Sequence, residues 1–238
     1  MAEPLYRTAP YQREALARVR ALGPDRGIVC DVSIFYPTGG GQPGDSGALR
    51  WQGGSVAVTT AVKGEGGAVV LVPDAAAALP PVGAEVTQLL DWDRRHAHMR
   101  VHTALHLLSV VIALPVTGGQ IGAGKGRLDF NMPEPPADLA ALEAEVNALI
   151  ARDLAVTEHW ITDAELAANP GLVKTLSVAP PAGQGRVRLI RIGTATEQVD
   201  LQPCGGTHVA HTGEIGAVRL GKIENKRRQN RRVSLELG

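Results

Sequence analysis

The chain has 238 residues, of which 44% are hydrophobic and 20% charged, the composition of a soluble globular protein with one large domain or two ordinary ones. Lysine plus arginine and aspartate plus glutamate both total 24, so no global basic field indicates a nucleic-acid partner, and any polyanion site must be local. Aromatic residues make up only 3% of the chain, which argues against a surface that stacks many exposed bases.

No apolar run approaches the ~18 residues of a membrane-spanning helix, and the N-terminal residues MAEPLYRTAPYQRE lack the layout of a signal peptide. We therefore expect a cytoplasmic protein without a membrane partner. The two cysteines, Cys30 and Cys204, lie far apart, and we expect no disulfide. Cys30 is expected to pack as a small apolar residue.

Residues 1–92 are predicted to form a small β-barrel-like domain. Four β-like segments follow one another at a spacing that indicates an antiparallel sheet or small barrel: GIVCDVSIFY, SVAVTTAVK, GAVVLVP and AEVTQLLD. The intervening PTGGGQPGDSG is too rich in glycine for a helix or a strand interior, and it predicts a structured loop.

Residues 93–238 are predicted to form a second domain that begins with a long buried helix. The segment RRHAHMRVHTALHLLSVVIAL contains no glycine or proline and ends before Pro115. A second helix is predicted after PEPPAD, where apolar residues recur at helical spacing: Leu139, Leu142, Val146, Leu149 and Ile150.

The rest of the second domain alternates between strands and one short helix. After the strand AVTEHWI, Thr162 and Glu165 form a predicted capping box for a brief helix that ends at Asn169-Pro170. The segments RVRLIRIG, GEIGAVRLGKI and RRVSLEL are predicted strands. The expected fold class is α+β, with helices packed on an antiparallel sheet in the second domain.

The long helix carries two histidines, His102 and His106, in the sequence HTALH. Residues four apart share one helix face, about 6 Å apart at Cβ, so both rings can reach one metal ion. Such pairs are more often core or surface residues, and HTALH alone leaves metal binding open. His98 lies ~12 Å along the axis from His106, too far to share that ion.

A second pair of metal-ligand types, Cys204 and His208, lies in QPCGGTHVAHTGEIG. The two glycines between them exclude an ordinary helix, and a glycine turn could aim both side chains inward. Together with the helical histidines they would make a tetrahedral set suited to one Zn²⁺. The alternative, a buried cysteine beside an unrelated histidine, stays open.

Several enzyme classes are excluded by the same residues. A zinc protease helix of the H-E-x-x-H kind needs a glutamate where Thr103 stands. No G-x-S-x-G nucleophile elbow occurs, and the G-x-G patterns do not open a helix after a strand. We therefore expect no nucleotide cofactor.

The combination of H-T-A-x-H on a helix, C-G-G-T-H downstream and FYPTGGGQPGDSG upstream resembles a known family. It is similar to the editing domain of alanyl-tRNA synthetase and to the free-standing alanyl-tRNA editing proteins of AlaX type, in their medium-length form. The resemblance covers nearly the whole chain. The paired histidine and C-G-G-T-H elements are otherwise shared mainly with the editing domain of threonyl-tRNA synthetase, and the GGGQ loop favours the alanyl branch.

The resemblance implies a trans-editing hydrolase that cleaves the ester joining serine or glycine to alanine tRNA, with mischarged alanine tRNA as its partner. It also implies zinc ligands and substrate contacts by position. The implied ligands are His102, His106, Cys204 and His208; the implied substrate-binding loop is Gly39, Gly40, Gly41 and Gln42. Thr38, which precedes this loop, is a further candidate substrate-binding residue because of its hydroxyl. Ser33 stands where the family usually has threonine, and Gln120 where the family places a polar residue near the substrate.

The chemistry of the site is left with alternatives. Four protein ligands leave no open position on zinc, so the ion is structural unless its coordination shell expands. Attack by zinc-activated water, attack by an ordered water on a zinc-anchored substrate, and assistance by a tRNA hydroxyl all remain open, and we name no general base. Gln120, Thr103 and Ser33 are the candidate catalytic residues. With Thr38 they could bind the serine hydroxyl, although each is equally suited to a structural role.

Phosphate contacts are expected from a basic run near the C-terminus, GKIENKRRQNRRVSLEL. A solvated turn is the plainer interpretation of such a run. Arg94, Arg95 and Arg100 flank the histidine helix and could add to the contacts. The run consists of Lys222, Lys226, Arg227, Arg228, Arg231 and Arg232.

Two other functions remain as alternatives. One is a zinc-stabilised RNA-binding module without catalysis, which should loosen when zinc is removed. The other is the same hydrolysis on a different mischarged tRNA, such as seryl-charged threonine tRNA. The sequence does not fix the oligomeric state, and a monomer is compatible with it.

Overall fold

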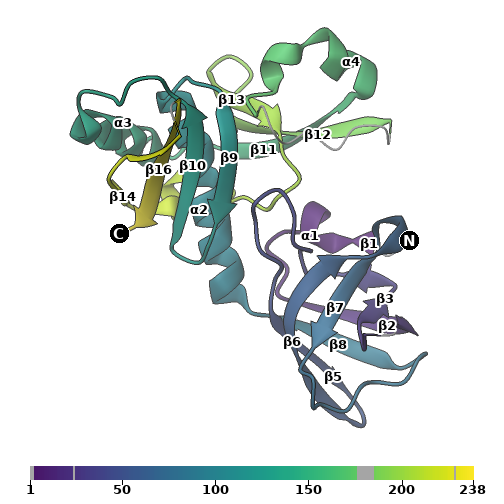
Figure 1. The fold of residues 1–238 in the computed structure, drawn as a ribbon. Coiled ribbons are helices and arrows are strands. Elements are labelled where there is room, and N and C mark those ends of the chain that lie inside the picture. The colour runs from purple at the N-terminus through teal and green to yellow at the C-terminus, as the bar shows by residue number, and fades with distance from the viewer. Residues whose placement is uncertain (1–2, 24, 176–184, 228) are drawn as a thin grey trace. The chain divides into compact units, whose positions relative to one another are not determined.

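The computed structural model describes residues 3–23, 25–175, 185–227 and 229–238. The chain forms two compact units, Met1–His96 and Ala97–Gly238. Trp92, where the sequence places the boundary, is the first residue of helix α2 (Trp92–Val111), and the division between the units falls within this helix. Figure 1 shows the strands of the first unit and the mixed helices and strands of the second.

The first unit is a closed barrel of six antiparallel strands, in the order β2-β3-β7-β6-β5-β8, which confirms the predicted barrel. Side chains alternate between the interior and the solvent: in β2 every second residue from Ala15 to Val19 is buried. The strands are β2 (Glu14–Leu22), β3 (Ile28–Cys30), β5 (Gly47–Trp51), β6 (Gly54–Lys63), β7 (Val69–Pro73) and β8 (Glu85–Leu90).

The segment GIVCDVSIFY differs from its prediction as one strand, because it breaks at Asp31 into β3 and β4 (Val32–Ser33). The Asp31 carboxylate accepts hydrogen bonds from the backbone N–H groups of Arg18 (2.8 Å) and Val32 (3.0 Å), which turns the chain at this point. Strand β4 pairs in parallel with β1 (Glu3–Pro4), and the short helices are α1 (Leu5–Thr8) and the 3₁₀ turn η1 (Glu65–Gly67).

The glycine-rich segment is a structured loop, as predicted. Gly39 and Gln42 exchange two backbone hydrogen bonds of 3.0 Å, and Gly40 and Gly41 between them have φ of 57° and 81°. Left-handed values at two successive positions suit glycine, since other residues are strained there. A Cβ on Gly44 would lie 2.0 Å from the Ala61 carbonyl oxygen, so the loop also packs directly on β6.

A buried ion pair anchors this loop within the first unit. Arg95 is 0% exposed, and its Nε lies 2.9 Å from Asp45 Oδ2, while its Nη groups donate to the Pro10 and Ile34 carbonyl oxygens. Asp45 also accepts from the Tyr36 backbone N–H. The guanidinium of Arg95 is fully buried and is paired within the protein, so it cannot reach a tRNA phosphate. This corrects the expectation that Arg95 adds to the phosphate contacts.

The described part of the second unit contains two antiparallel sheets. The larger runs β14-β16-β10-β9, with β15 also paired to β16, and the smaller runs β11-β12-β13. These elements confirm the predicted α+β class. Their strands are β9 (Val116–Ile121), β10 (Lys125–Asn131), β11 (Val156–Thr162), β12 (Arg186–Gly193), β13 (Gln198–Pro203), β14 (Val218–Leu220), β15 (Glu224–Arg227) and β16 (Asn230–Leu237).

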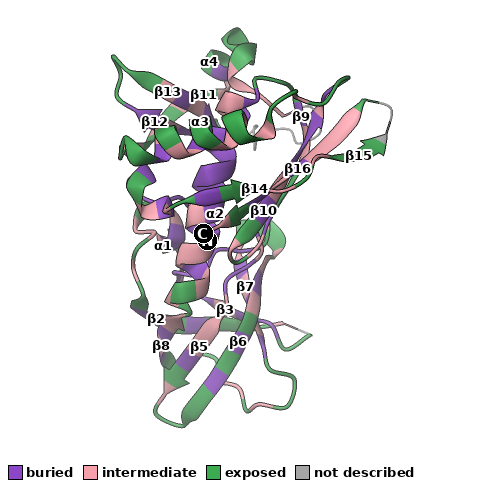
Figure 2. Cartoon of the chain, turned by 90° about the vertical axis from the view of Figure 1, so that its left-hand side faces the viewer, coloured by how far each residue is buried: buried purple, intermediate pink, exposed green. Residues whose placement is uncertain are grey.

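Helix α2 is the core of the second unit. Every residue from Val101 to Ser109 is buried, and Figure 2 shows this C-terminal half of the helix as largely purple. This half of the helix is therefore surrounded by protein on all sides. Strand β10 lies directly on it: a Cβ on Gly126 would come within 2.6 Å of Val101 and 3.0 Å of Leu105. Glycine is therefore needed at this contact.

The remaining helices are short and capped. Helix α3 (Leu139–Ala151) begins with Asp138 accepting from the Ala141 N–H, and α4 (Asp163–Ala168) has the predicted capping box of Thr162 and Glu165.

The segment GEIGAVRLGKI is not one strand as predicted. It begins in the 3₁₀ turn η3 (Thr212–Ile215), turns at Gly216 with φ of 71°, and only then enters β14. The 3₁₀ turn η2 (Pro170–Leu172) follows α4.

Among the described residues, no helix combines the length and the apolar character needed to cross a membrane.

Candidate metal centre

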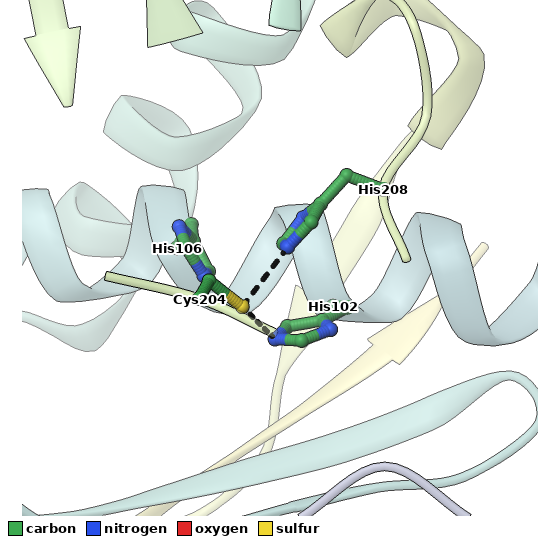
Figure 3. A group of neighbouring side chains, drawn as sticks. All are labelled: His102, His106, Cys204 and His208. Atoms are coloured by element: carbon green, nitrogen blue, oxygen red, sulfur yellow. Dashed lines mark hydrogen bonds between the residues drawn. The ribbon is translucent and has the colours of Figure 1, made fainter. Parts of the chain in front are cut away.

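His102 and His106 lie one helical turn apart on α2, and their ring centroids are 5.3 Å apart. Cys204 follows β13 directly, and His208 lies in the irregular segment after it. The four side chains converge, as Figure 3 shows, with one candidate ligand atom from each lying within 4.8 Å of all the others. The cluster could hold a metal ion.

Cys204 is central to the cluster. Its Sγ lies 3.4 Å from His102 Nε2 and 3.2 Å from His208 Nε2. The Gly206 N–H points at the same sulfur, at 3.5 Å. The two glycines after Cys204 therefore let the backbone fold back so that both Cys204 and His208 face α2.

The C-G-G segment is held by Arg188 on β12. Its Nη1 donates to the carbonyl oxygens of Cys204 (3.1 Å) and Gly206 (2.8 Å), and its Nε donates to Glu158 Oε2 at 2.7 Å. The Cys204 N–H in turn donates to the Arg188 carbonyl oxygen. This clamp fixes the backbone that presents the sulfur.

The electrostatics of the cluster favour a thiolate beside a neutral imidazole. Burial alone would raise the pKa of Cys204, but the neighbouring His102 and His208 lower it well below its usual value. Burial and the charge of His102 lower the pKa of His208 to about 3. Thiolate and neutral imidazole are the forms in which these side chains bind metals.

His106 behaves differently because of Asp200. Burial disfavours its protonated form, but hydrogen bonds to Asp200 and Cys204 outweigh burial and raise the pKa of His106 to about 9. The Asp200 carboxyl would likewise be raised by burial, yet His106 and Lys174 lower its pKa to about 2. A metal ion that binds His106 must therefore displace a proton from it at neutral pH.

The sequence did not assign Asp200 or Lys174 to the centre, but Asp200 contacts it and Lys174 contacts Asp200. Asp200 Oδ2 lies 3.0 Å from His106 Nδ1, and Lys174 Nζ lies 2.6 Å from Asp200 Oδ1. The sequence did contain a signal for Asp200. Asp200, Gln202 and Cys204 are spaced two residues apart along β13 and its extension, so their side chains lie on one face of the strand. Thr103, a predicted site residue, lies 3.1 Å from His208 Nδ1 through its Oγ1.

The other predicted polar residues have partners away from the cluster. Gln120 on β9 is exposed and accepts from Arg127 Nε at 3.2 Å. Ser33 and Thr38 belong to the first unit, where the buried Ser33 hydroxyl accepts from the Phe35 N–H (3.2 Å) and Thr38 accepts from the Gly44 N–H (2.9 Å). The loop residues Gly39, Gly40, Gly41 and Gln42 also lie in the first unit, with Gln42 buried.

The basic run lies on and around β15 and β16. Lys222 is exposed, Lys226 pairs with Glu224, and Arg228 lies outside the described residues, as does the side chain of Arg227. Arg231 donates to the carbonyl oxygens of Met132 and Pro133, and Arg232 to both Asp129 oxygens at 2.7 and 3.0 Å. Some of the N–H donors of these two arginines are therefore already bonded within the chain.

The remaining histidines lie outside the cluster. His98 is 1% exposed, and His96 stacks on Trp92 with ring centroids 5.2 Å apart. His211 is exposed and caps η3, and His159 contacts the Thr157 hydroxyl at 3.2 Å. None of these four belongs to the described group of potential metal ligands.

The two cysteines should differ sharply in reactivity. Cys30 is 2% exposed, and burial together with the charge of Asp31 raises its pKa to about 12, whereas Cys204 is partly exposed with a lowered pKa. We expect iodoacetamide at pH 8 to alkylate Cys204 alone in the folded, metal-free protein, and added Zn²⁺ to block that reaction. Peptide mass spectrometry reads both sites. Alkylation of Cys204 at the same rate with and without Zn²⁺ would contradict a metal site here.

Comparison with known proteins gives matches along the whole chain. A family model described as "Threonyl and Alanyl tRNA synthetase second additional domain" matches residues 187–234, and one described as "tRNA synthetases class II (A)" matches residues 8–94. The alanyl-tRNA editing protein AlaX-M of Methanosarcina acetivorans is 34% identical over 247 residues, covering 100% of this chain and 99% of that protein.

Two further relatives show the same pattern. The alanyl-tRNA editing protein AlaX-M of Saccharolobus solfataricus is 33% identical over 238 residues, and the match covers 98% of each chain. The alanine–tRNA ligase of Pyrobaculum neutrophilum is 36% identical over 222 residues, which are 90% of this chain but only 24% of the ligase. The similarity is thus end to end with the shorter proteins and confined to one part of the ligase.

Proposed function

This chain belongs to the family of alanyl-tRNA editing proteins of AlaX-M type, and from that premise we propose that it hydrolyses the aminoacyl ester of mischarged alanine tRNA. The substrate we propose is alanine tRNA that carries serine or glycine in place of alanine. The reaction releases the wrong amino acid in trans. The observation that carries the proposal is the convergence of His102, His106, Cys204 and His208 into one buried cluster.

We propose Zn²⁺, one ion per chain, as the metal of this cluster. Ligands around a tetrahedral zinc at bonds of about 2.0–2.3 Å lie about 3.3–3.8 Å apart, close to the 3.2 and 3.4 Å that separate Cys204 Sγ from the two Nε2 atoms. One thiolate with three imidazoles also suits zinc by ligand softness. When bound, zinc supplies a Lewis acid that can polarise an ester carbonyl or orient a water.

The chain's own residues are proposed to bind and select the amino acid. Alanine is the correct product and must be spared, so a site that hydrogen-bonds the serine hydroxyl leaves polar groups unpaired when alanine enters. Ser33, Thr38 and Gln120 remain our candidates for this contact. The exposed Gln120 needs the least rearrangement, because it would exchange only the bond from Arg127.

The experiment that tests the function measures release of amino acid from seryl-charged and alanyl-charged alanine tRNA. We expect fast release of serine and sparing of alanine. Serine on threonine tRNA is the comparison that separates the substrate alternatives: release as fast as from alanine tRNA would favour an editor of broader or different tRNA choice. Binding of tRNA without release from any substrate would favour the RNA-binding module instead.

We propose that the basic run contacts tRNA phosphates. In the Arg227→Ala/Arg228→Ala variant, loss of two charges should weaken tRNA binding and reduce the slope of log affinity against log salt by about 2. Filter binding between 50 and 200 mM salt would measure that slope.

A matched control for this prediction is Arg20→Ala/Arg50→Ala, which removes two exposed arginines from barrel strands. An unchanged salt slope in the Arg227/Arg228 variant, or an equal loss of tRNA affinity and salt slope in the control, would contradict the proposal that the run at 222–232 contacts the phosphates.

A further inference from the structure

One hydrogen-bonded network holds His106 both at its imidazole ring and at its backbone carbonyl oxygen. Asp200 Oδ2 takes up the Nδ1 edge of the ring at 3.0 Å, and Gln202 Nε2 donates to the same carboxylate oxygen at 2.7 Å. Gln202 Nε2 also lies 3.3 Å from Ser109 Oγ, whose hydroxyl donates to the His106 carbonyl oxygen at 2.7 Å. The network therefore closes on His106 itself.

Asp200 is built to stay in this position. Its side chain is 0% exposed, and besides His106 and Gln202 it accepts from Lys174 Nζ at 2.6 Å. Three donors on one buried carboxylate leave it little rotational freedom. With Nδ1 of His106 committed to Asp200, the nitrogen left for the cluster is Nε2.

His208 shows the same arrangement with a neutral partner. Thr103 is 0% exposed, and its single hydroxyl hydrogen is donated to the Met99 carbonyl oxygen at 3.0 Å. The Thr103 oxygen must then act as acceptor toward His208 Nδ1 at 3.1 Å, as it also does toward the Val209 N–H at 3.3 Å. His208 thus carries its proton on Nδ1 and turns an unprotonated Nε2 toward Cys204 Sγ, 3.2 Å away.

We propose that Asp200 and Thr103 are positioning residues that keep a proton on Nδ1 of His106 and of His208, so that Nε2 is the nitrogen that each ring directs at the metal. Residues in this role commonly change metal affinity by about 10–100-fold. The proposal rests on the proposed zinc site. It also gives Thr103 a task other than contact with substrate, because its hydroxyl already has three partners.

The sharpest test replaces Thr103, because two near-isosteric variants differ only in the hydroxyl. Zinc affinity is measured by competition with a chromophoric chelator, on folded protein as judged by circular dichroism. Thr103→Val should bind zinc about 10–100-fold more weakly, and Thr103→Ser should restore affinity to near the wild-type value. The matched control is Thr212→Val, which removes another fully buried threonine hydroxyl, bonded to Leu154 and Ile150, outside the cluster.

The Asp200 arm uses Asp200→Asn, with Asp129→Asn as its control, since Asp129 is also a buried carboxylate and is held by Arg127 and Arg232 away from the cluster. Imidazole ¹⁵N chemical shifts of the zinc-loaded protein supply a second readout. In the wild type both His106 and His208 should be protonated at Nδ1, and each variant should disturb only the ring that its residue contacts.

The outcomes separate this proposal from the proposed function. If the wild type binds no zinc, the metal site itself is wrong. If the wild type binds zinc and the folded Thr103→Val and Asp200→Asn variants match it within twofold, the site stands and the positioning roles are overturned. Deacylation is not used as a readout, so a failure of catalysis does not enter the result.

Discussion

In the Cys204→Ala variant we expect the affinity for zinc to fall by more than about 100-fold, because residues that merely orient a ligand already contribute about 10–100-fold. Cys204 is the only thiol in the cluster, and its sulfur lies within 3.4 Å of two ring nitrogens. Its removal leaves three imidazoles.

The measurement is zinc content after dialysis against a mild chelator, together with competition titration for the affinity. Cys30→Ala is the control, since Cys30 is buried in the barrel core and does not belong to the group of potential ligands found among the described residues. The control should keep its zinc. Retention of one zinc per chain by Cys204→Ala would show that the ion binds without the thiolate, and the proposed ligand set would be wrong.

The second large effect is expected in the first unit, where Asp45→Ala would leave the guanidinium of Arg95 buried without its counter-ion. Arg95 is 0% exposed and Asp45 1% exposed, so water cannot replace the lost carboxylate without opening the structure. Removing one partner of a buried pair costs about 3–5 kcal/mol. The Tyr36 N–H loses its acceptor as well.

Thermal unfolding followed by circular dichroism measures this cost, and a fall in Tm of more than about 10 °C is expected. The exposed pair of Arg20 and Asp31, 3.4 Å apart, supplies the contrast: Arg20→Ala should cost under about 1 kcal/mol. A Tm for Asp45→Ala within 2–3 °C of the wild type would contradict the account of the glycine-rich loop as anchored by this pair, at roughly 4–8 °C per kcal/mol for a domain of this size.

The sequence predicted correctly those helices and strands whose local residue pattern agrees with the packing that surrounds them in the structure. The capping box at Thr162 and the predicted strand RVRLIRIG both reappear, the latter as β12 with the same bounds. Strand β2 was not predicted, because EALARVRAL is rich in alanine, leucine and arginine, which favour helices. Pairing with β3 and β8 overrides that preference, since it buries every second side chain from Ala15 to Val19.

The four candidate ligands were accessible from sequence because each pair is local: one helical turn for His102 and His106, one glycine turn for Cys204 and His208. The residues behind them were not identified, although the period of β13 places Asp200 on the same face as Cys204. The contact of Asp200 with His106, and that of Lys174 with Asp200, form only in the tertiary fold. The structure describes the barrel loop and the cluster in separate units, so the expected contact of GGGQ with the substrate remains a prediction.

The most direct test of the central claim is the rate of serine release from seryl-charged alanine tRNA as zinc is returned to the metal-free protein. We expect negligible release without zinc, a rate that rises with bound zinc, and saturation at one ion per chain. A rate that is the same in the metal-free and the zinc-loaded protein would contradict the claim that the cluster of His102, His106, Cys204 and His208 is the editing site.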